Sequence, residues 1–177
     1  GPPPLRNPIA LSKRIQTLTD DKLGRRRVLG LMQNWPLTVD KILDHATAWH
    51  GDREVVSRSV EGPIVRTTYA GIHERAKRLS NALKGLGVQP GDRVATLAWN
   101  SARHIEAWYG IMGMGAVCHT LNPRLFAEQL CYIINHAEDR IIFTDLTFAP
   151  VLAEHWPKLP TVKHIVVMTD REGMKGV

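Results

Sequence analysis

Three polar residues follow short apolar segments of this 177-residue sequence, and their types suit contact with a polar ligand. Asn100 ends the segment RVATLAWN, whereas Asn122 and Arg124 follow the segment AVCHTL. If both segments are strands of a parallel sheet, the three residues lie at its carboxyl edge, where open parallel sheets bind ligands. A structural alternative is that Asn122 caps the turn before Pro123 and that Arg124 pairs with a neighbouring acid.

A glycine-rich stretch over residues 110–115 raises the question of a phosphate-binding loop. Such a loop needs a strand before it and a helix N-terminus after it, so that free backbone N–H groups point at the anion. Here the order is reversed, because Gly110, Gly113 and Gly115 stand between a predicted helix and a predicted strand. We expect them to let the helix lie close on the sheet and the chain turn. No Gly-Lys dipeptide of a Walker motif occurs either.

Cysteine and histidine spacing predicts no metal site. Cys118 and Cys131 are too few for a disulfide framework or a zinc site, and none of the eight histidines lies in an HExxH pattern. So few cysteines favour a reducing compartment, and we expect a cytoplasmic location. No transmembrane segment is predicted, because the longest apolar runs, such as residues 165–168, are far shorter than the roughly 18 residues of a membrane span.

The net charge of +6 is concentrated at the start of the sequence. Residues 1–28 carry seven basic and two acidic side chains, a net charge of +5, whereas residues 29–177 carry 16 basic and 15 acidic ones. We expect residues 1–28 to be a poorly ordered leader, natural or added, with an Arg-rich targeting or anion-binding arm as the alternative. Because the remainder is nearly neutral, no nucleic-acid partner is expected.

Hydrophobic periodicity predicts alternating elements after the leader. Thr38, Thr68 and Ser101 are expected helix N-caps. Helices are expected over residues 38–50, 69–86, 101–115, 128–139 and 148–159, a hairpin over 54–69, and strands over 93–100, 116–121, 140–145 and 164–170. One helix carries an apolar stripe of Ile72, Ala76, Leu79, Ala82, Leu83 and Leu86. The pattern indicates an α/β fold: short, mostly parallel strands covered by helices on both faces, with a small N-terminal β-hairpin.

Several spaced motifs occur in an order that resembles the N-terminal region of adenylate-forming acyl-CoA synthetases, in particular the medium- and long-chain fatty acyl-CoA ligases. The resemblance covers roughly residues 29–170. Its motifs are Thr68-Tyr69, Gly91-Asp92-Arg93-Val94, Gly113-x-Gly115-Ala116 and Asn122-Pro123-Arg124-Leu125. It implies that residues 29–177 form the N-terminal α/β lobe of such a ligase.

The resemblance also implies a two-step reaction of the full-length enzyme. The carboxylate of a fatty acid or another carboxylic acid attacks the α-phosphorus of ATP, giving an acyl-adenylate and pyrophosphate, and the thiol of coenzyme A then displaces AMP. ATP, Mg²⁺ and coenzyme A are therefore expected for the full-length enzyme. The phosphate loop, the ribose-binding aspartate and the mobile lysine of the family belong to parts that this sequence does not include. No catalytic residue is assigned, and the 177-residue chain alone is expected to be inactive and to bind none of these compounds tightly.

A function of another class stays open. Some members of the family that the sequence resembles pair through their N-terminal domains. The chain could therefore be a stand-alone dimerisation or interaction module, and a homodimer is a possible partner arrangement in either case.

Overall fold

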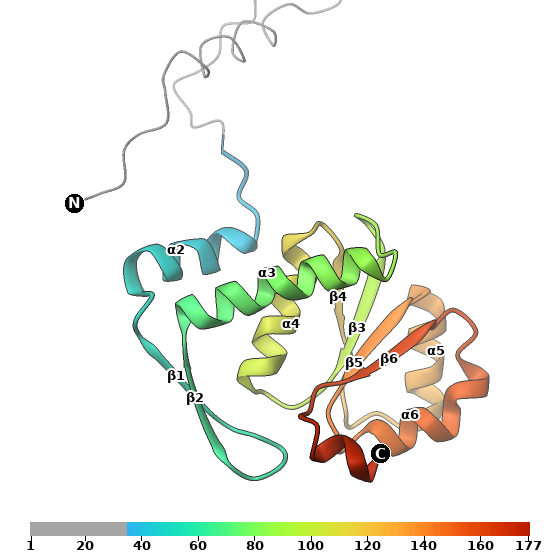
Figure 1. Cartoon of the computed structure of the whole chain (residues 1–177). Helices are drawn as coiled ribbons and strands as arrows, with labels where there is room; N and C mark the ends of the chain where they lie inside the picture. The colour runs from blue at the N-terminus through green and yellow to red at the C-terminus, as the bar shows by residue number, and fades with distance from the viewer. Residues whose placement is uncertain (1–34) are drawn as a thin grey trace, which may run out of the picture. The chain divides into compact units, whose positions relative to one another are not determined.

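Helices and strands alternate along residues 35–177, the part of the chain that the computed structural model describes (Figure 1). The predicted leader over residues 1–28 lies outside the described residues. Within 35–177, no helix combines the length and the apolar character needed to cross a membrane. The elements are α2 (Asp40–His50), β1 (Glu54–Arg58), β2 (Ile64–Thr68), α3 (Tyr69–Gly85), β3 (Arg93–Leu97), α4 (Ala102–Gly113), β4 (Val117–Thr120), α5 (Ala127–Ala137), β5 (Ile141–Thr144), α6 (Ala149–His155), η1 (Trp156–Lys158), β6 (His164–Val167) and η2 (Gly173–Gly176).

Four of the strands form one parallel sheet in the order β4-β3-β5-β6. Helices α3 and α4 lie on one face of this sheet, and α5 and α6 lie on the other (Figure 1). The prediction of a parallel sheet with helices on both faces is confirmed. β1 and β2 form a separate antiparallel hairpin, as predicted. In its register, Glu54 lies opposite Thr68.

Two apolar clusters hold the sheet between its helices, because alternate residues of β3 and β5 point to opposite faces. One cluster includes Ala95, Leu97 and Ile142 and packs against α5 and α6 through Leu130, Ile134 and Leu152. The other includes Val94, Ile141 and Phe143 and packs against α3 and α4 through Leu83, Ala107 and Ile111. Continuous burial of β3 and β5 is typical of the inner strands of a parallel sheet.

The tip of the hairpin is fixed by Glu61. Its carboxylate accepts hydrogen bonds from Arg103 at 2.7 Å and from the Thr169 hydroxyl at 2.5 Å. Burial alone would raise the pKa of Glu61, but these hydrogen bonds outweigh it and lower the pKa to about 2. Arg103 also donates to the Met168 carbonyl. We call Glu61, Arg103 and Thr169 the hairpin latch, since they join the hairpin to α4 and to the segment after β6.

Two of the three predicted caps are confirmed. The Thr68 hydroxyl accepts from the N–H of Gly71, and the Ser101 hydroxyl accepts from the N–H of His104. The prediction for Thr38 is wrong, because Val39 is the N-cap of α2 and no side chain caps the helix. The Thr38 hydroxyl instead hydrogen-bonds the Asp40 carboxylate, and this contact lowers the pKa of Asp40.

The glycines at the end of α4 differ from one another. A Cβ at Gly110 would lie 2.9 Å from the Leu79 side chain, so this glycine brings α4 close to α3 rather than to the sheet. Gly115 has φ +87° and makes the turn into β4. A Cβ at Gly113 would find nothing nearer than the Ser80 hydroxyl at 3.9 Å. The prediction that Gly113 is required for close packing is therefore wrong.

The apolar stripe of α3 is only partly buried by the other residues of the range 35–177. Ile72, Ala76 and Leu83 are buried as predicted. Ala82 is exposed, however, and Leu86 is 45% exposed. Part of the stripe therefore faces outward.

Candidate functional site

The strand order creates a switch point between β3 and β5. From β3 the chain continues into α4 on one face of the sheet, whereas from β5 it continues into α6 on the other face (Figure 1). In doubly wound sheets, ligands bind outside the carboxyl ends of the strands at such a point. The loops that follow β3 and β5 are therefore the candidate site.

Asn100 lies in the loop after β3, where its side chain is exposed. This loop is tied to the neighbouring one, because the backbone N–H of Trp99 donates to the Asp145 carboxylate at 2.6 Å. Asp145 directly follows β5 and is 2% exposed. Burial raises the pKa of Asp145, and the hydrogen bond from Trp99 offsets part of that shift.

His104 supports the same loop from α4. The indole N–H of Trp108 donates to Nε2 of His104 at 2.9 Å, so this ring nitrogen is an acceptor. The proton of the neutral ring must then be on Nδ1, which donates to the Trp99 carbonyl at 3.1 Å. Burial lowers the pKa of His104 and so favours this neutral form. Trp99 is thus held through both its N–H and its carbonyl.

Asn122 and Arg124 follow β4, at the same edge of the sheet but outside the switch point. Oδ1 of Asn122 accepts from the backbone N–H of Arg124 at 3.0 Å, the capped turn of the structural alternative. The ion pair of that alternative does not form: over residues 35–177, Arg124 has no acidic partner, and its side chain is exposed. Within the same range, no hydrogen bond joins either residue to Asn100.

Sequence reasoning missed Asp145, His104 and Trp108. Asp145 carried a signal, since it is the last residue of the predicted strand RIIFTD and so had to lie at the carboxyl edge. His104 and Trp108 carried none, because their helical spacing is equally typical of core packing. Their role depends on the turn at Trp99, which only the folded chain defines.

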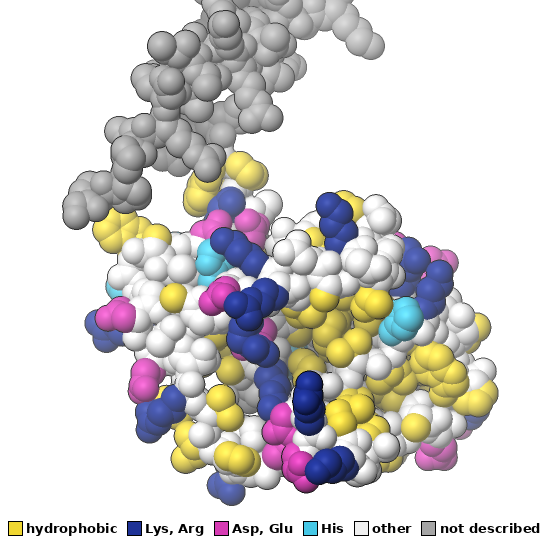
Figure 2. All heavy atoms as spheres, in the orientation of Figure 1, with side chains coloured by type: hydrophobic (Ala, Val, Ile, Leu, Met, Phe, Trp, Pro, Cys, Tyr) yellow, Lys and Arg dark blue, Asp and Glu magenta, His cyan; other side chains and the backbone are white. Residues whose placement is uncertain are grey.

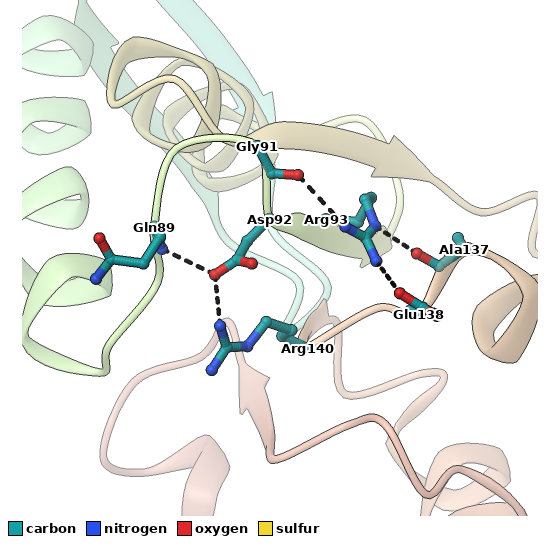
Figure 3. Close-up of polar contacts among 7 residues, drawn as sticks. All are labelled: Gln89, Gly91, Asp92, Arg93, Ala137, Glu138 and Arg140. Carbon is teal, nitrogen blue, oxygen red and sulfur yellow. Dashed lines mark hydrogen bonds and ion pairs between the residues drawn. The ribbon is translucent and has the colours of Figure 1, made fainter.

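At the opposite, amino end of the sheet, the motif Gly91-Asp92-Arg93 forms a network of polar contacts (Figure 3). The Asp92 carboxylate accepts from the N–H of Gln89 at 2.8 Å and from Arg140 at 2.7 Å. These two partners, the N–H of Gln89 first, lower the pKa of Asp92. Arg93 donates to the Ala137 carbonyl at 2.5 Å and to the Glu138 carboxylate at 2.6 Å, across the end of α5. The motif has a structural role.

A buried carboxylate lies at the start of β5. Asp139 is fully buried, and one of its oxygens lies 2.7 Å from Nδ1 of His119. Its other oxygen has no partner among residues 35–177. Burial raises the pKa of Asp139, and the contact with His119 only partly compensates.

Residues 43–176 match the family of AMP-binding enzymes. The chain belongs to this family. It is 49% identical over 144 residues to the 3-methylmercaptopropionyl-CoA ligase of Ruegeria lacuscaerulensis, covering 81% of this chain and 27% of the relative. It is 46% identical over 141 residues to the medium-chain-fatty-acid–CoA ligase of Ectopseudomonas oleovorans, covering 80% of this chain and 26% of that ligase.

A solved structure of the anthranilate CoA ligase AuaEII in complex with anthranoyl-AMP has the same fold. Its TM-score is 0.68 at 24% identity, over 82% of this chain and 29% of that one. The expectation of an acyl-CoA synthetase-like N-terminal lobe is confirmed. The chain spans about a quarter of the length of these curated relatives.

Two features of the described residues bear on where ATP and Mg²⁺ could bind. The glycines at 113 and 115 lead from α4 into β4, the wrong order for a phosphate loop. Over residues 35–177, no group of three or more His, Cys, Asp or Glu side chains could hold a metal ion. What this part of the chain does offer is an exposed amide, Asn100, on a loop held in place at the switch point.

Proposed function

We propose that this chain is the N-terminal part of a cytoplasmic fatty acid–CoA ligase. The full-length enzyme would activate the carboxylate of a fatty acid with ATP and Mg²⁺, releasing pyrophosphate, and coenzyme A would then displace AMP through its thiol. The observation that carries this proposal is the match of residues 43–176 to AMP-binding enzymes together with 46% identity to a medium-chain-fatty-acid ligase.

The geometry supports a positioning role for this part of the chain. The loop after β3 is fixed through Asp145 and His104, while Asn100 beside it stays exposed. Asn100 would contact a polar part of the substrates, and Arg124 would contribute an exposed positive charge near the same edge. Because the chemistry also needs groups that these residues do not supply, we propose that the 177-residue chain alone is inactive and binds ATP weakly.

A hybrid ligase tests the proposal. In it, this chain replaces the matching segment of the Ectopseudomonas oleovorans ligase, and pyrophosphate release is measured with octanoate, ATP·Mg²⁺ and coenzyme A. We expect the hybrid ligase to form acyl-CoA, and the 177-residue chain to release no pyrophosphate and to give no saturable ATP binding in calorimetry. The unmodified ligase is the positive control. A folded hybrid ligase that is inactive on carboxylates of every chain length would contradict the proposal.

Pairing of two copies is a second proposal, and α2 supports it. Ile42 and Trp49 of this helix are 63% and 74% exposed, and large exposed apolar side chains on one element are typical of an interaction surface. We expect light scattering to give a dimer mass for the chain and a monomer mass for the Ile42→Asp/Trp49→Asp variant. A monomer mass for the unmodified chain at every concentration would exclude the dimer.

A further inference from the structure

An apolar groove opens between α3, α4 and the β5–β6 side of the sheet. It has a volume of about 320 Å³, and its floor includes Leu79, Ala82, Ala107, Phe143 and Met168. Figure 2 shows this hollow as a group of hydrophobic side chains beside a stripe of basic ones. The groove lies on the α3–α4 face of the sheet, and its lining also includes Arg103 and Thr169 of the hairpin latch.

The groove exists because helices cover this face of the sheet incompletely. Parallel sheets are normally buried on both faces. On the face of α3 and α4, however, Val166 and Met168 at the β6 side are only partly buried, and Ala82 of the α3 stripe is exposed. The sequence predicts burial at Leu79 and Ala82, which belong to the apolar stripe of α3. Their apolar side chains on this face therefore indicate that a further element packs over it.

The charged side chains that line the groove favour some occupants over others. The lining contains three arginines and one glutamate. Arg75 pairs with Glu106 and Arg78 with Glu74, yet their side chains remain 59% and 72% exposed. An occupant that brings carboxylates to this rim is therefore favoured. Two copies that met through this groove would bring their exposed arginines together, which opposes self-association here.

We propose that the groove binds an amphipathic segment from the remaining three quarters of the full-length ligase. Its apolar face would pack on Ala82 and Met168, and its acidic side chains would face Arg75 and Arg78. The length supports this occupant, because the chain spans only 27% of its Ruegeria relative, whose remainder has to pack on some surface of this lobe. The inference rests on the proposed function.

Cysteine labelling tests the proposal at two positions of α3. Ala82→Cys lies in the groove, and the control Lys84→Cys is exposed on the other side of the helix, about 200° away at 3.6 residues per turn. Maleimide labelling, read peptide by peptide in a mass spectrometer, is compared between the 177-residue chain and the hybrid ligase. In the hybrid ligase we expect labelling to slow about tenfold or more at position 82 and to change by less than about twofold at position 84.

Each outcome decides the question. Unchanged labelling at position 82, or equal protection at both positions, in a hybrid ligase that unfolds cooperatively in urea would overturn the proposal. Protection of position 82 in the 177-residue chain that grows with its concentration would assign the groove to a second copy instead. A hybrid ligase that is inactive but protected at position 82 would refute the proposed function and leave the groove assignment standing. A hybrid ligase that is active but unprotected at position 82 would support the proposed function and overturn the groove assignment.

Discussion

The two ends of the parallel sheet are built differently. At the amino end, Asp92, Arg93 and Arg140 are all engaged in ion pairs or hydrogen bonds that cross from one loop to another (Figure 3). At the carboxyl end, the backbone of the loop after β3 is fixed, but the side chains of Asn100 and Arg124 are exposed. Polar residues thus stabilise one end, while at the other they remain available to a ligand.

This difference separates two uses of the family motifs. The polar side chains of the motif Gly91-Asp92-Arg93 are engaged within the lobe, so a structural role accounts for them. Asn100 and Arg124, which follow the carboxyl ends of β3 and β4, are better candidates for contact with substrate, since their side chains are exposed. Substitutions at the amino end are therefore expected to lower stability more than activity. Substitutions of the exposed residues at the carboxyl end are expected to lower activity more than stability. The following predictions test this contrast in order of decreasing effect on the free energy of unfolding.

A substitution in the hairpin latch has the largest expected effect on stability. The latch is an exception to the contrast between the two ends, because it is a structural cluster at the carboxyl side. Glu61→Gln should lower the free energy of unfolding at pH 7 by about 3 kcal/mol, since the pKa of Glu61 falls from 4.5 to about 2 in the folded chain. The sign follows from the lowered pKa: the contribution is complete above about pH 4.5 and is lost as the pH falls toward 2. Urea unfolding from pH 7 to 2.5 measures both effects. Parallel curves for the variant and the unmodified chain over the acid range would contradict the prediction.

The latch also shows where sequence reasoning ends. Alternating periodicity predicted the succession of elements and the parallel sheet, because those depend on local patterns and on how right-handed crossovers pack. Thr169 and Glu61 are 108 residues apart, and no local pattern connects them. In the same way, Gly110 and Gly113 look equivalent in the sequence, but only Gly110 faces another helix closely.

The candidate site was predicted in part for the same reason. Asn100 and Asn122 each follow a strand, so their place at the carboxyl edge was foreseeable. Which of them lies at the switch point depends on the strand order β4-β3-β5-β6, and the sequence order does not reveal that β5 pairs with β3.

Arg93 gives the next largest effect. Arg93→Ala should lower the free energy of unfolding by about 2 kcal/mol, because it removes the donor of the Ala137 carbonyl and the partner of Glu138 at the end of α5. Urea unfolding at pH 7 measures the change, and Arg124→Ala is the matched control at the other end of the sheet. Equal losses for the two variants would remove the proposed difference between the ends.

Asp139 tests whether every charge at the amino end is stabilising. Its pKa is raised by burial, so the favourable contribution of its carboxyl group is present at low pH and is lost as the pH rises through the folded pKa. Asp139→Asn keeps an oxygen for His119 and removes the buried charge. Relative to the unmodified chain, the variant should gain free energy of unfolding as the pH rises above 3.8, the ordinary pKa of an aspartate, and through the raised folded pKa. A relative loss above pH 3.8 in thermal or urea unfolding would show that the contact with His119 outweighs burial.

The smallest effect on stability is expected at the carboxyl edge, where the effect on activity should be largest. Asn100→Ala and Arg124→Ala should each change the free energy of unfolding by less than about 0.5 kcal/mol, because both side chains are exposed. In the hybrid ligase, Asn100→Ala should lower kcat/KM about tenfold through a lost substrate contact. Arg124→Ala should have a smaller effect, since Arg124 lies after β4 and outside the switch point. Pyrophosphate release over a range of ATP and octanoate concentrations separates the two variants. A larger loss for Arg124→Ala would move the candidate site from the β3–β5 switch point to the loop after β4, and unchanged kinetics for both would mean that the exposed residues of this edge do not contact substrate.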